Sequence, residues 1–253
     1  MSRTVVLVTG ANQGLGFEVV KKLVAEQENY TVILCSRDLK RGKEAAAQIT
    51  NLAKNSEVDV LQLDVTSDAS IAAAVTAVEQ KYGELDVLFN NAGIARASGS
   101  EREAMLKVYE VNVVGVVLVT KAFLPLVMKS KTKRLVIMSS DVGSISWATN
   151  PDYRYFFYQD TTYKPTKAAV NMVGAVMSNL HGKDGLKVNI VNPGLRTTNL
   201  NNYTKDGGSA EGGAFEACRM ITLGSEGDVL TYTEDSRDPA GPYIGGEKKN
   251  IPW

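Results

Sequence analysis

Short runs of apolar and β-branched residues alternate along this chain with longer amphipathic segments. The segments between the runs carry helical periodicity, as the spacing of Phe17, Val20, Leu23 and Val24 illustrates. This alternation is typical of a parallel sheet with helices on both faces, so the sequence predicts a single doubly wound α/β domain over residues 1–253. We expect strands at Thr4–Val8, Thr31–Cys35, Val58–Leu63, Leu85–Asn90, Arg134–Ser139 and Lys187–Val191.

Composition excludes several classes of function. The 28 basic and 28 acidic residues cancel, which argues against a nucleic-acid or anionic-membrane partner. Two cysteines without Cys-x-x-Cys spacing and a single histidine indicate neither a disulfide framework nor a metal site. The N-terminus carries no leader pattern, and no apolar run reaches the roughly 18 residues of a membrane span. We therefore expect a cytoplasmic protein without a membrane segment.

A glycine-rich turn, TGANQGLG at residues 9–16, follows the first strand and opens the first helix. Small residues there let the backbone approach a pyrophosphate, and the helix N-terminus supplies amide donors. The alternative is a simple tight turn. If the turn binds a dinucleotide, its contacts are Gly10, Asn12, Gln13, Gly14, Leu15 and Gly16.

The end of the second strand bears on the choice of cofactor. An NAD site usually offers an acidic residue there, whereas this chain has Ser36-Arg37, with Arg41 one helical turn later. Arginines bind a 2′-phosphate through charge-assisted hydrogen bonds, so the sequence favours NADPH. Asp38 weakens this argument, and both arginines could instead decorate the exposed start of a helix.

Tyr163 and Lys167 lie four residues apart in a segment with helical character, so they share one helix face. An ammonium beside a phenol favours the phenolate and lowers the pKa of the tyrosine. Such a pair can serve a carbonyl reductase as a proton donor, although most Tyr-x-x-x-Lys pairs are merely solvated surface. Pro165 between them is tolerated in a first helical turn, which places the helix start near Thr161 or Thr162.

The chain resembles the short-chain dehydrogenase/reductase family over nearly its whole length. The motifs that carry the resemblance occur in the family's order: TGANQGLG, Asp64-Val65, Asn90-Asn91-Ala92-Gly93, Asn112, Ser139-Ser140, Tyr163 with Lys167, and Asn192-Pro193-Gly194. The ANQGLGF turn, Ser36-Arg37 and the ending with SAEGGAFEACRMITLG, GPYIGG and IPW look most like the carbonyl-reductase-like branch. The resemblance implies a Rossmann domain with a seven-stranded parallel sheet.

The resemblance also implies roles for individual residues. Tyr163 would be the general acid, Lys167 would lower its pKa and hold the nicotinamide ribose, and Ser140, or alternatively Ser139, would bind the carbonyl oxygen. Asn112 would hold a water that links Lys167 to solvent. The implied cofactor contacts are Asp64 and Val65 at the adenine, Asn91, Ala92 and Gly93 at the adenosine ribose, and Pro193, Gly194, Leu195 and Thr197 at the nicotinamide end. The Asn90–Gly93 segment could equally stabilise the central strands.

Two segments break the regular pattern and border the expected site. Residues 141–162 form an aromatic loop that either lines a pocket for a bulky apolar or aromatic substrate or only packs onto the domain. Residues 195–209, rich in Asn, Thr and Gly, are expected to form a substrate lid. The aromatic residues of the first segment are Trp147, Tyr153, Tyr155, Phe156, Phe157 and Tyr158.

The sequence therefore predicts an NADPH-dependent oxidoreductase that reduces a ketone or aldehyde carbonyl of a small molecule. Three alternatives stay open: an NAD-dependent alcohol dehydrogenase, a reductase-derived enzyme of dehydration or cyclisation, and a cofactor-binding sensor without catalysis. The segment 108–127 is apolar nearly all round, which indicates burial on the sheet and a second contact such as another subunit. Homodimer, tetramer and monomer all remain open.

Overall fold

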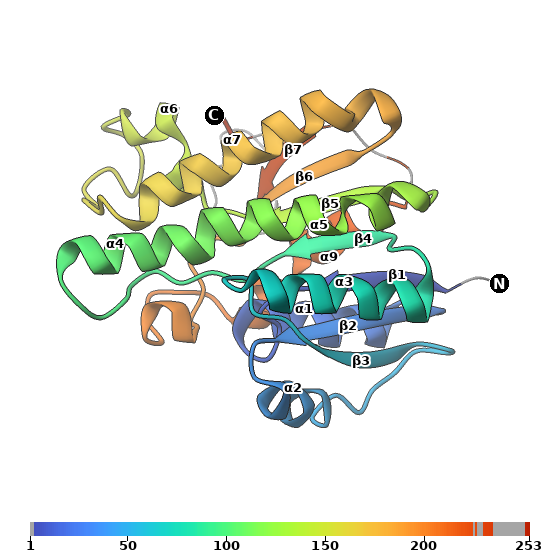
Figure 1. Ribbon diagram of the computed structural model, residues 1–253. Helices are drawn as coiled ribbons and strands as arrows, with labels where there is room; N and C mark the ends of the chain where they lie inside the picture. The colour runs from blue at the N-terminus through green and yellow to red at the C-terminus, as the bar shows by residue number, and fades with distance from the viewer. Residues whose placement is uncertain (1–2, 225, 227–229, 235–250) are drawn as a thin grey trace.

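The computed structural model describes residues 3–224, 226, 230–234 and 251–253. Seven parallel strands form one sheet in the order β3-β2-β1-β4-β5-β6-β7 (Figure 1). This arrangement confirms the predicted doubly wound fold and its seven strands. The strands are β1 Thr4–Val8, β2 Tyr30–Ser36, β3 Glu57–Gln62, β4 Val87–Asn90, β5 Arg134–Met138, β6 Lys187–Asn192 and β7 Leu230–Glu234.

The strand limits differ from the prediction mainly at β4, which begins two residues later than expected. The reason is Asp86, whose carboxylate accepts a hydrogen bond from the Val5 amide at 2.8 Å and binds the hydroxyl of Ser130. The Val5 amide is thus bound by a side chain, although the Asp86 backbone amide still donates to the Val5 carbonyl oxygen at 3.0 Å. The seventh strand, Leu230–Glu234, had no predicted position, and it pairs with β6 at the edge of the sheet.

Helices cover both faces of the sheet. The alternating side chains of β1 show the division, since Val5 and Leu7 belong to one apolar cluster and Val6 and Val8 to the other. Helices α3, α5 and α7 pack on the first face, and α1, α2 and α9 on the second. The helices are α1 Gly14–Glu26, α2 Leu39–Ala46, α3 Asp68–Tyr82, α4 Glu101–Tyr109, α5 Gly115–Lys129, α6 Ile145–Ala148, α7 Tyr163–His181, α8 Ala210–Gly213 and α9 Phe215–Ile221.

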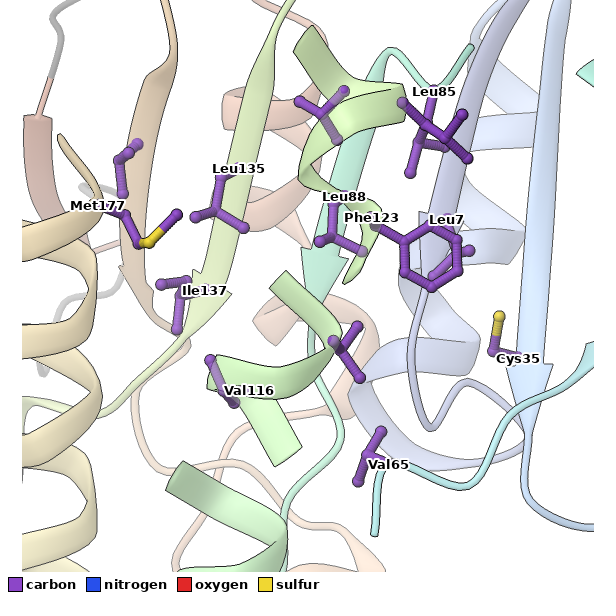
Figure 2. Close-up of a cluster of buried hydrophobic side chains, with 14 of the residues drawn as sticks. Leu7, Cys35, Val65, Leu85, Leu88, Val116, Phe123, Leu135, Ile137 and Met177 are labelled. Carbon is purple, nitrogen blue, oxygen red and sulfur yellow. The ribbon is translucent and has the colours of Figure 1, made fainter. Parts of the chain in front are cut away.

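The first cluster is the larger and fixes the helices that bear on the site. Phe123 of α5 lies over Leu7 and Leu88, and Met177 of α7 lies beside Leu135 (Figure 2). Replacing a buried phenylalanine such as Phe123 by alanine typically costs about 3–5 kcal/mol. The positions of α5 and α7 are therefore set by the same core that holds the central strands.

The expected apolar helix 108–127 is part of a longer helical segment with an interruption. Helix α4 passes into a five-residue π-turn, Glu110–Val114, and then into α5. By length and composition alone, the segment Glu101–Lys129 could cross a membrane, unlike the expectation that no run would qualify. In this fold its inner side, including Val119 and Phe123, is buried on the sheet (Figure 1).

Because all described strands are parallel, their carboxyl ends lie at one edge of the sheet. The glycine turn after β1, the Asn-rich turn after β4, the two serines after β5 and the loop after β6 all follow strands at this edge. Helix α7 begins at Tyr163, so Pro165 stands in its first turn as predicted. The GPYIGG motif lies outside the described residues.

Candidate functional site

A cleft of about 240 Å³ opens at the carboxyl edge of the sheet. The glycine turn, the ends of β2 to β5, the start of α7 and the loop after β6 border it. The predicted site residues that line it are Gly10, Asn12, Gln13, Gly14, Leu15, Arg37, Asp64, Val65, Asn91, Ala92, Gly93, Tyr163, Lys167 and Pro193. Parallel strands thus bring together residues that lie up to about 180 positions apart in the sequence.

The glycine turn has the geometry of an anion-binding loop. Gly10 and Gly14 have φ angles of 62° and 60°, which side-chain-bearing residues rarely adopt. A Cβ on Gly10 would lie only 2.9 Å from the Cα of Ala92, so the turn is pressed against the end of β4. The side chain of Gln13 makes no capping hydrogen bond to α1, and the helix N-terminus borders the cleft. Its first-turn amides can therefore receive a phosphate group.

The two arginines after β2 both line the cleft. Asp38 caps helix α2, because its Oδ1 accepts a hydrogen bond from the Arg41 amide at 3.1 Å. The Nε of Arg41 lies 3.9 Å from the other carboxylate oxygen, in an exposed and weak pair. Asp38 thus caps the helix, but it also lines the cleft beside Arg37 and Arg41, so it still offsets part of their positive charge there.

Four predicted cofactor contacts do not border the cleft: Gly16, Gly194, Leu195 and Thr197. The space at Gly16 is filled by the side-chain amide of Asn91, so this glycine serves the packing of α1 on the end of β4. The hydroxyl of Thr197 donates to the carbonyl oxygens of Thr204 and Gly207, at 2.8 and 3.0 Å. The next three residues, Thr198, Asn199 and Leu200, border the cleft instead. Of the predicted contacts after β6, Pro193 therefore borders the cleft, and the assignment of the others to the cofactor stays a prediction.

Two of the lining residues also hold the backbone in place. The side-chain Nδ2 of Asn91 donates to the Thr9 carbonyl oxygen at 2.8 Å, which ties the end of β4 to the glycine turn. Asp64 accepts hydrogen bonds from the amide and the hydroxyl of Thr66, at 2.9 and 2.7 Å. The structural role that the sequence left open for the Asn90–Gly93 segment is present, alongside its place at the cleft.

Tyr163, Lys167 and Asn112 converge on the turn after β4. A Cβ placed on Gly93 would lie 3.4 Å from Asn112 Oδ1 and 3.9 Å from Lys167 Nζ. Lys167 Nζ lies 5.5 Å from the centre of the Tyr163 ring and donates to the carbonyl oxygen of Met138 at 3.0 Å. The helical spacing of the pair therefore does place both side chains in one site.

Asn112 lies in the π-turn and is fully buried. Its side chain accepts from the Ile94 amide and donates to the Ile94 carbonyl, both at 2.8 Å, and donates to Thr166 Oγ1 at 3.1 Å. It thus clamps the loop after β4 to helix α7. Interruptions of this kind in α-helices are frequent at functional sites.

The electrostatics of the pair differ from the prediction. Burial raises the pKa of Tyr163 above its usual value, and Tyr158, Asp141 and Asp160 act in the same direction. Burial lowers the pKa of Lys167 to about 8. The expectation that Lys167 lowers the pKa of Tyr163 is therefore not met, because the ammonium is directed to a backbone carbonyl and both groups are removed from water.

The two serines after β5 have different surroundings. Ser139 lines the cleft, but its hydroxyl donates to Asn171 Oδ1 at 2.6 Å. Ser140 is only partly buried, and its hydroxyl donates to Asp141 Oδ1 at 3.2 Å. Ser140 therefore has the weaker internal hydrogen bond, whereas Ser139 is held firmly within the helix–strand packing.

The aromatic loop divides into an inner and an outer group. Trp147 stacks on Tyr153 with ring centres 5.2 Å apart, and Tyr155 meets Tyr153 edge-on at 5.6 Å. These rings pack the insertion onto the domain. Phe157 is 85% exposed, and Tyr158 is exposed just before the start of α7. No residue of the loop lines the described cleft.

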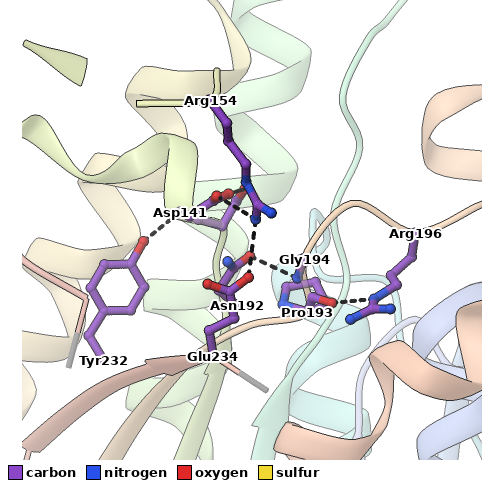
Figure 3. Close-up of polar contacts among 9 residues, drawn as sticks. Asp141, Arg154, Asn192, Pro193, Gly194, Arg196, Tyr232 and Glu234 are labelled. Atoms are coloured by element: carbon purple, nitrogen blue, oxygen red, sulfur yellow. Dashed lines mark hydrogen bonds and ion pairs between the residues drawn. The ribbon is translucent and has the colours of Figure 1, made fainter. Parts of the chain in front are cut away.

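Sequence reasoning missed two charged residues of this loop. Asp160 accepts hydrogen bonds from the amides of Thr162 and Tyr163, at 2.8 and 2.6 Å, and from the Tyr158 hydroxyl at 2.8 Å. Arg154 pairs with Asp141 and Glu234 (Figure 3). Asp160 could have been found from the sequence, because an acidic residue just before a predicted helix start is a typical cap. Nothing in the local sequence indicates the role of Arg154.

Comparisons with known proteins agree with the fold and with the family resemblance. The short chain dehydrogenase family model matches residues 4–208. The short-chain dehydrogenase anuI of Penicillium roqueforti is 36% identical over 249 residues, which cover 94% of this chain and 96% of that protein. Salutaridine reductase of Papaver somniferum is 27% identical over 296 residues, covering 89% and 92%. The structure of NADPH-bound carbonyl reductase from chicken fatty liver aligns over 100% of both chains with a TM-score of 0.76 and 26% identity.

Proposed function

The chain belongs to the short-chain dehydrogenase family of oxidoreductases, and from that premise we propose that it reduces a ketone or aldehyde carbonyl with NADPH. The proposed substrate is a bulky apolar or aromatic small molecule. The carbonyl reductase and salutaridine reductase to which the chain is similar support this direction of reaction. We treat residues 1–253 as one catalytic domain.

One observation carries the proposal. Tyr163 and Lys167 line the β4–β5 side of the same cleft whose β2 side presents Arg37 and Arg41. Asn112 lies with Lys167 beside Gly93, just behind that lining. A proton donor and a phosphate-binding cation pair would thus share one groove. Neither group alone would distinguish a reductase from a nucleotide-binding module.

The residues at the cleft fit a dinucleotide with a 2′-phosphate. The uncapped N-terminus of α1 would hold the pyrophosphate, and Arg37 and Arg41 would hold the 2′-phosphate. Asp64 and Val65 would border the adenine, and Thr198 to Leu200 would close the groove over Gly14. When bound, NADPH supplies the hydride that reduces the carbonyl carbon.

The chain's own residues supply the proton and the orientation. Tyr163 is protonated at neutral pH and can donate that proton to the developing alkoxide, although burial raises its pKa and makes it a weaker acid. Lys167, with a pKa of about 8, can carry and release a proton in the physiological range. Ser140 would bind the carbonyl oxygen, and Asn112 keeps the turn after β4 fixed to α7.

Tyr163→Phe tests the assigned acid. We expect loss of NADPH consumption by at least about a hundredfold on a panel of aromatic ketones and aldehydes, while NADPH still binds in a fluorescence titration. Near wild-type turnover in this variant would refute the assignment. Loss of cofactor binding as well would show that Tyr163 has a mainly structural role.

Arg37→Ala tests the cofactor preference. Loss of a charge-assisted phosphate contact should weaken NADPH binding by roughly ten- to a hundredfold and leave NADH binding little changed. Lys40→Ala is the matched control, because Lys40 is an exposed cation of α2 outside the cleft lining. Equal losses for both cofactors would contradict a 2′-phosphate site at Arg37.

A further inference from the structure

A chain of polar contacts connects the catalytic edge of the sheet to the aromatic loop. Ser140 donates its hydroxyl proton to Asp141 Oδ1 at 3.2 Å, and Asp141 Oδ2 lies 3.3 Å from Arg154 Nη2. The same nitrogen lies 3.2 Å from Glu234 Oε1 at the end of β7 (Figure 3). Ser140 is also held through its carbonyl oxygen, which accepts a hydrogen bond from the Tyr232 hydroxyl.

The two carboxylates in this chain are almost fully removed from water. The side chains of Asp141 and Glu234 are only 3% and 2% exposed, whereas that of Arg154 is 26% exposed. A buried carboxylate without a counter-charge is strongly unfavourable. Although burial opposes its charged form, the neighbouring Asp141 and Glu234 raise the pKa of Arg154, so the guanidinium stays charged.

Arg154 is held in one place by more than its ion pairs. Its guanidinium carbon lies 4.7 Å from the centre of the Tyr155 ring, and Tyr155 meets Tyr153, which stacks on Trp147. The guanidinium therefore stands at a fixed point relative to Asp141. This rigidity matters because Asp141 competes with any substrate for the single hydroxyl proton of Ser140.

We propose that Arg154 is a positioning residue of the carbonyl-binding site, which pairs with Asp141 and thereby keeps the Ser140 hydroxyl available to a substrate oxygen. The proposal rests on the function proposed above for Ser140. A carboxylate whose charge is shared with a guanidinium is a weaker acceptor for the serine than an uncompensated one. Without Arg154, Asp141 would retain the serine proton, and the growing negative charge on the substrate oxygen would lose a donor.

The test compares Arg154→Met with Arg219→Met. Arg219 pairs with Glu216 of α9 at 2.6 Å, and the exposed fractions of 30% and 2% nearly match those of the Arg154 pairs. Neither Arg219 nor Glu216 lines the described cleft. We expect Arg154→Met to lower kcat about tenfold on aromatic ketones with a smaller change in KM, Arg154→Lys to restore part of it, and Arg219→Met to have little effect.

Asp141→Asn separates positioning from general destabilisation. If Arg154 acts through Asp141, adding Arg154→Met to an Asp141→Asn protein should lower kcat by less than twofold. A full tenfold loss in that background would overturn the proposal. An unchanged kcat in the single Arg154→Met variant would overturn it as well.

A readout without turnover distinguishes this proposal from the proposed function. Both tryptophans of the chain lie beside the network, because Trp147 stacks on Tyr153 and Trp253 lies 5.5 Å from Tyr232. Arg154→Met should shift the tryptophan emission, and Arg219→Met should not. An unshifted emission in Arg154→Met of an active enzyme would refute the proposal alone. A wild-type protein inactive on the whole ketone panel would refute the proposed function and, with it, the role of Ser140 on which the proposal rests.

Discussion

The carboxylate of Asp160 accepts a hydrogen bond from the backbone amide of Tyr163, with 2.6 Å between Oδ1 and nitrogen. Helix α7 therefore starts at the residue that we assign as the proton donor, and Thr162 contributes no side-chain cap. The same carboxylate binds the Tyr158 hydroxyl at 2.8 Å. One acidic side chain thus fixes both the start of α7 and an aromatic residue beside it.

Asp160→Ala should lower the free energy of unfolding by about 0.5–2 kcal/mol, because the first turn of α7 loses its cap. Asp160→Asn keeps an acceptor and should lose less than half of that. Urea denaturation of the two variants measures the difference. Equal stability of Asp160→Ala and wild type would show that the hydrogen bonds contribute nothing to the helix start.

Lys167 makes stability depend on pH. Its folded pKa of about 8 lies below the unfolded value of about 10.4, so the unfolded state binds more protons between these values. The cost of burying the charge is fully present below pH 8 and disappears as pH rises toward 10. From pH 7 to pH 9.5, wild type should therefore gain about 1–3 kcal/mol relative to Lys167→Met, measured by urea denaturation at each pH. A parallel pH dependence of the two proteins would contradict the lowered pKa.

Gly10→Ala should be strongly destabilising for two separable reasons. The φ angle of 62° is strained for alanine, and the added Cβ would lie 2.9 Å from Ala92 Cα. Gly83→Ala is the matched control, since Gly83 has a φ of 78° and nothing within 4 Å of an added Cβ. We expect about 1–2 kcal/mol for the control and roughly 2–5 kcal/mol for Gly10→Ala in thermal unfolding. Similar losses of stability in both variants would show that the end of β4 moves enough to accommodate the added Cβ at residue 10.

Truncation to alanine should affect stability little at Phe157 and strongly at Tyr153. Phe157→Ala removes a ring that is 85% exposed and should change stability by less than about 0.5 kcal/mol, whereas Tyr153→Ala removes a buried ring and should cost about 3–5 kcal/mol. If the outer ring contacts substrate, Phe157→Ala should also raise KM for aromatic ketones several-fold. An unchanged KM would restrict the aromatic loop to packing.

The fold followed from the sequence because strand and helix periodicity are local properties that the core then reinforces. The inward and outward alternation of Val5, Val6, Leu7 and Val8 is one example. Residues at the ends of strands were also placed correctly, since parallel pairing brings those ends together without further information. Strand β7 was not predicted, although its two threonines and its tyrosine are residues that favour strands.

The errors concern groups whose partners come from distant parts of the chain. The spacing of Tyr163 and Lys167 located the pair, but the ammonium binds the carbonyl of Met138, which belongs to another element. Arg154 binds Glu234, 80 positions away, and no motif records such a contact. The partner of a hydrogen bond and the burial of a charge depend on this tertiary context. For this reason the sequence predicted a lowered pKa for Tyr163, whereas burial raises it.

The π-turn between α4 and α5 connects the candidate site to the core, because its length sets which way the side chains on either side of it face. The turn accommodates one residue more than a turn of α-helix does. The side chains of α5 are therefore shifted by about 100° around the helix axis relative to an uninterrupted helix. This rotation lets Asn112 face helix α7 while Phe123, eleven residues later, faces the sheet. Deleting a single residue from this turn would misdirect either the asparagine or the phenylalanine, so we expect an insertion or deletion here to disturb the candidate site and the core together.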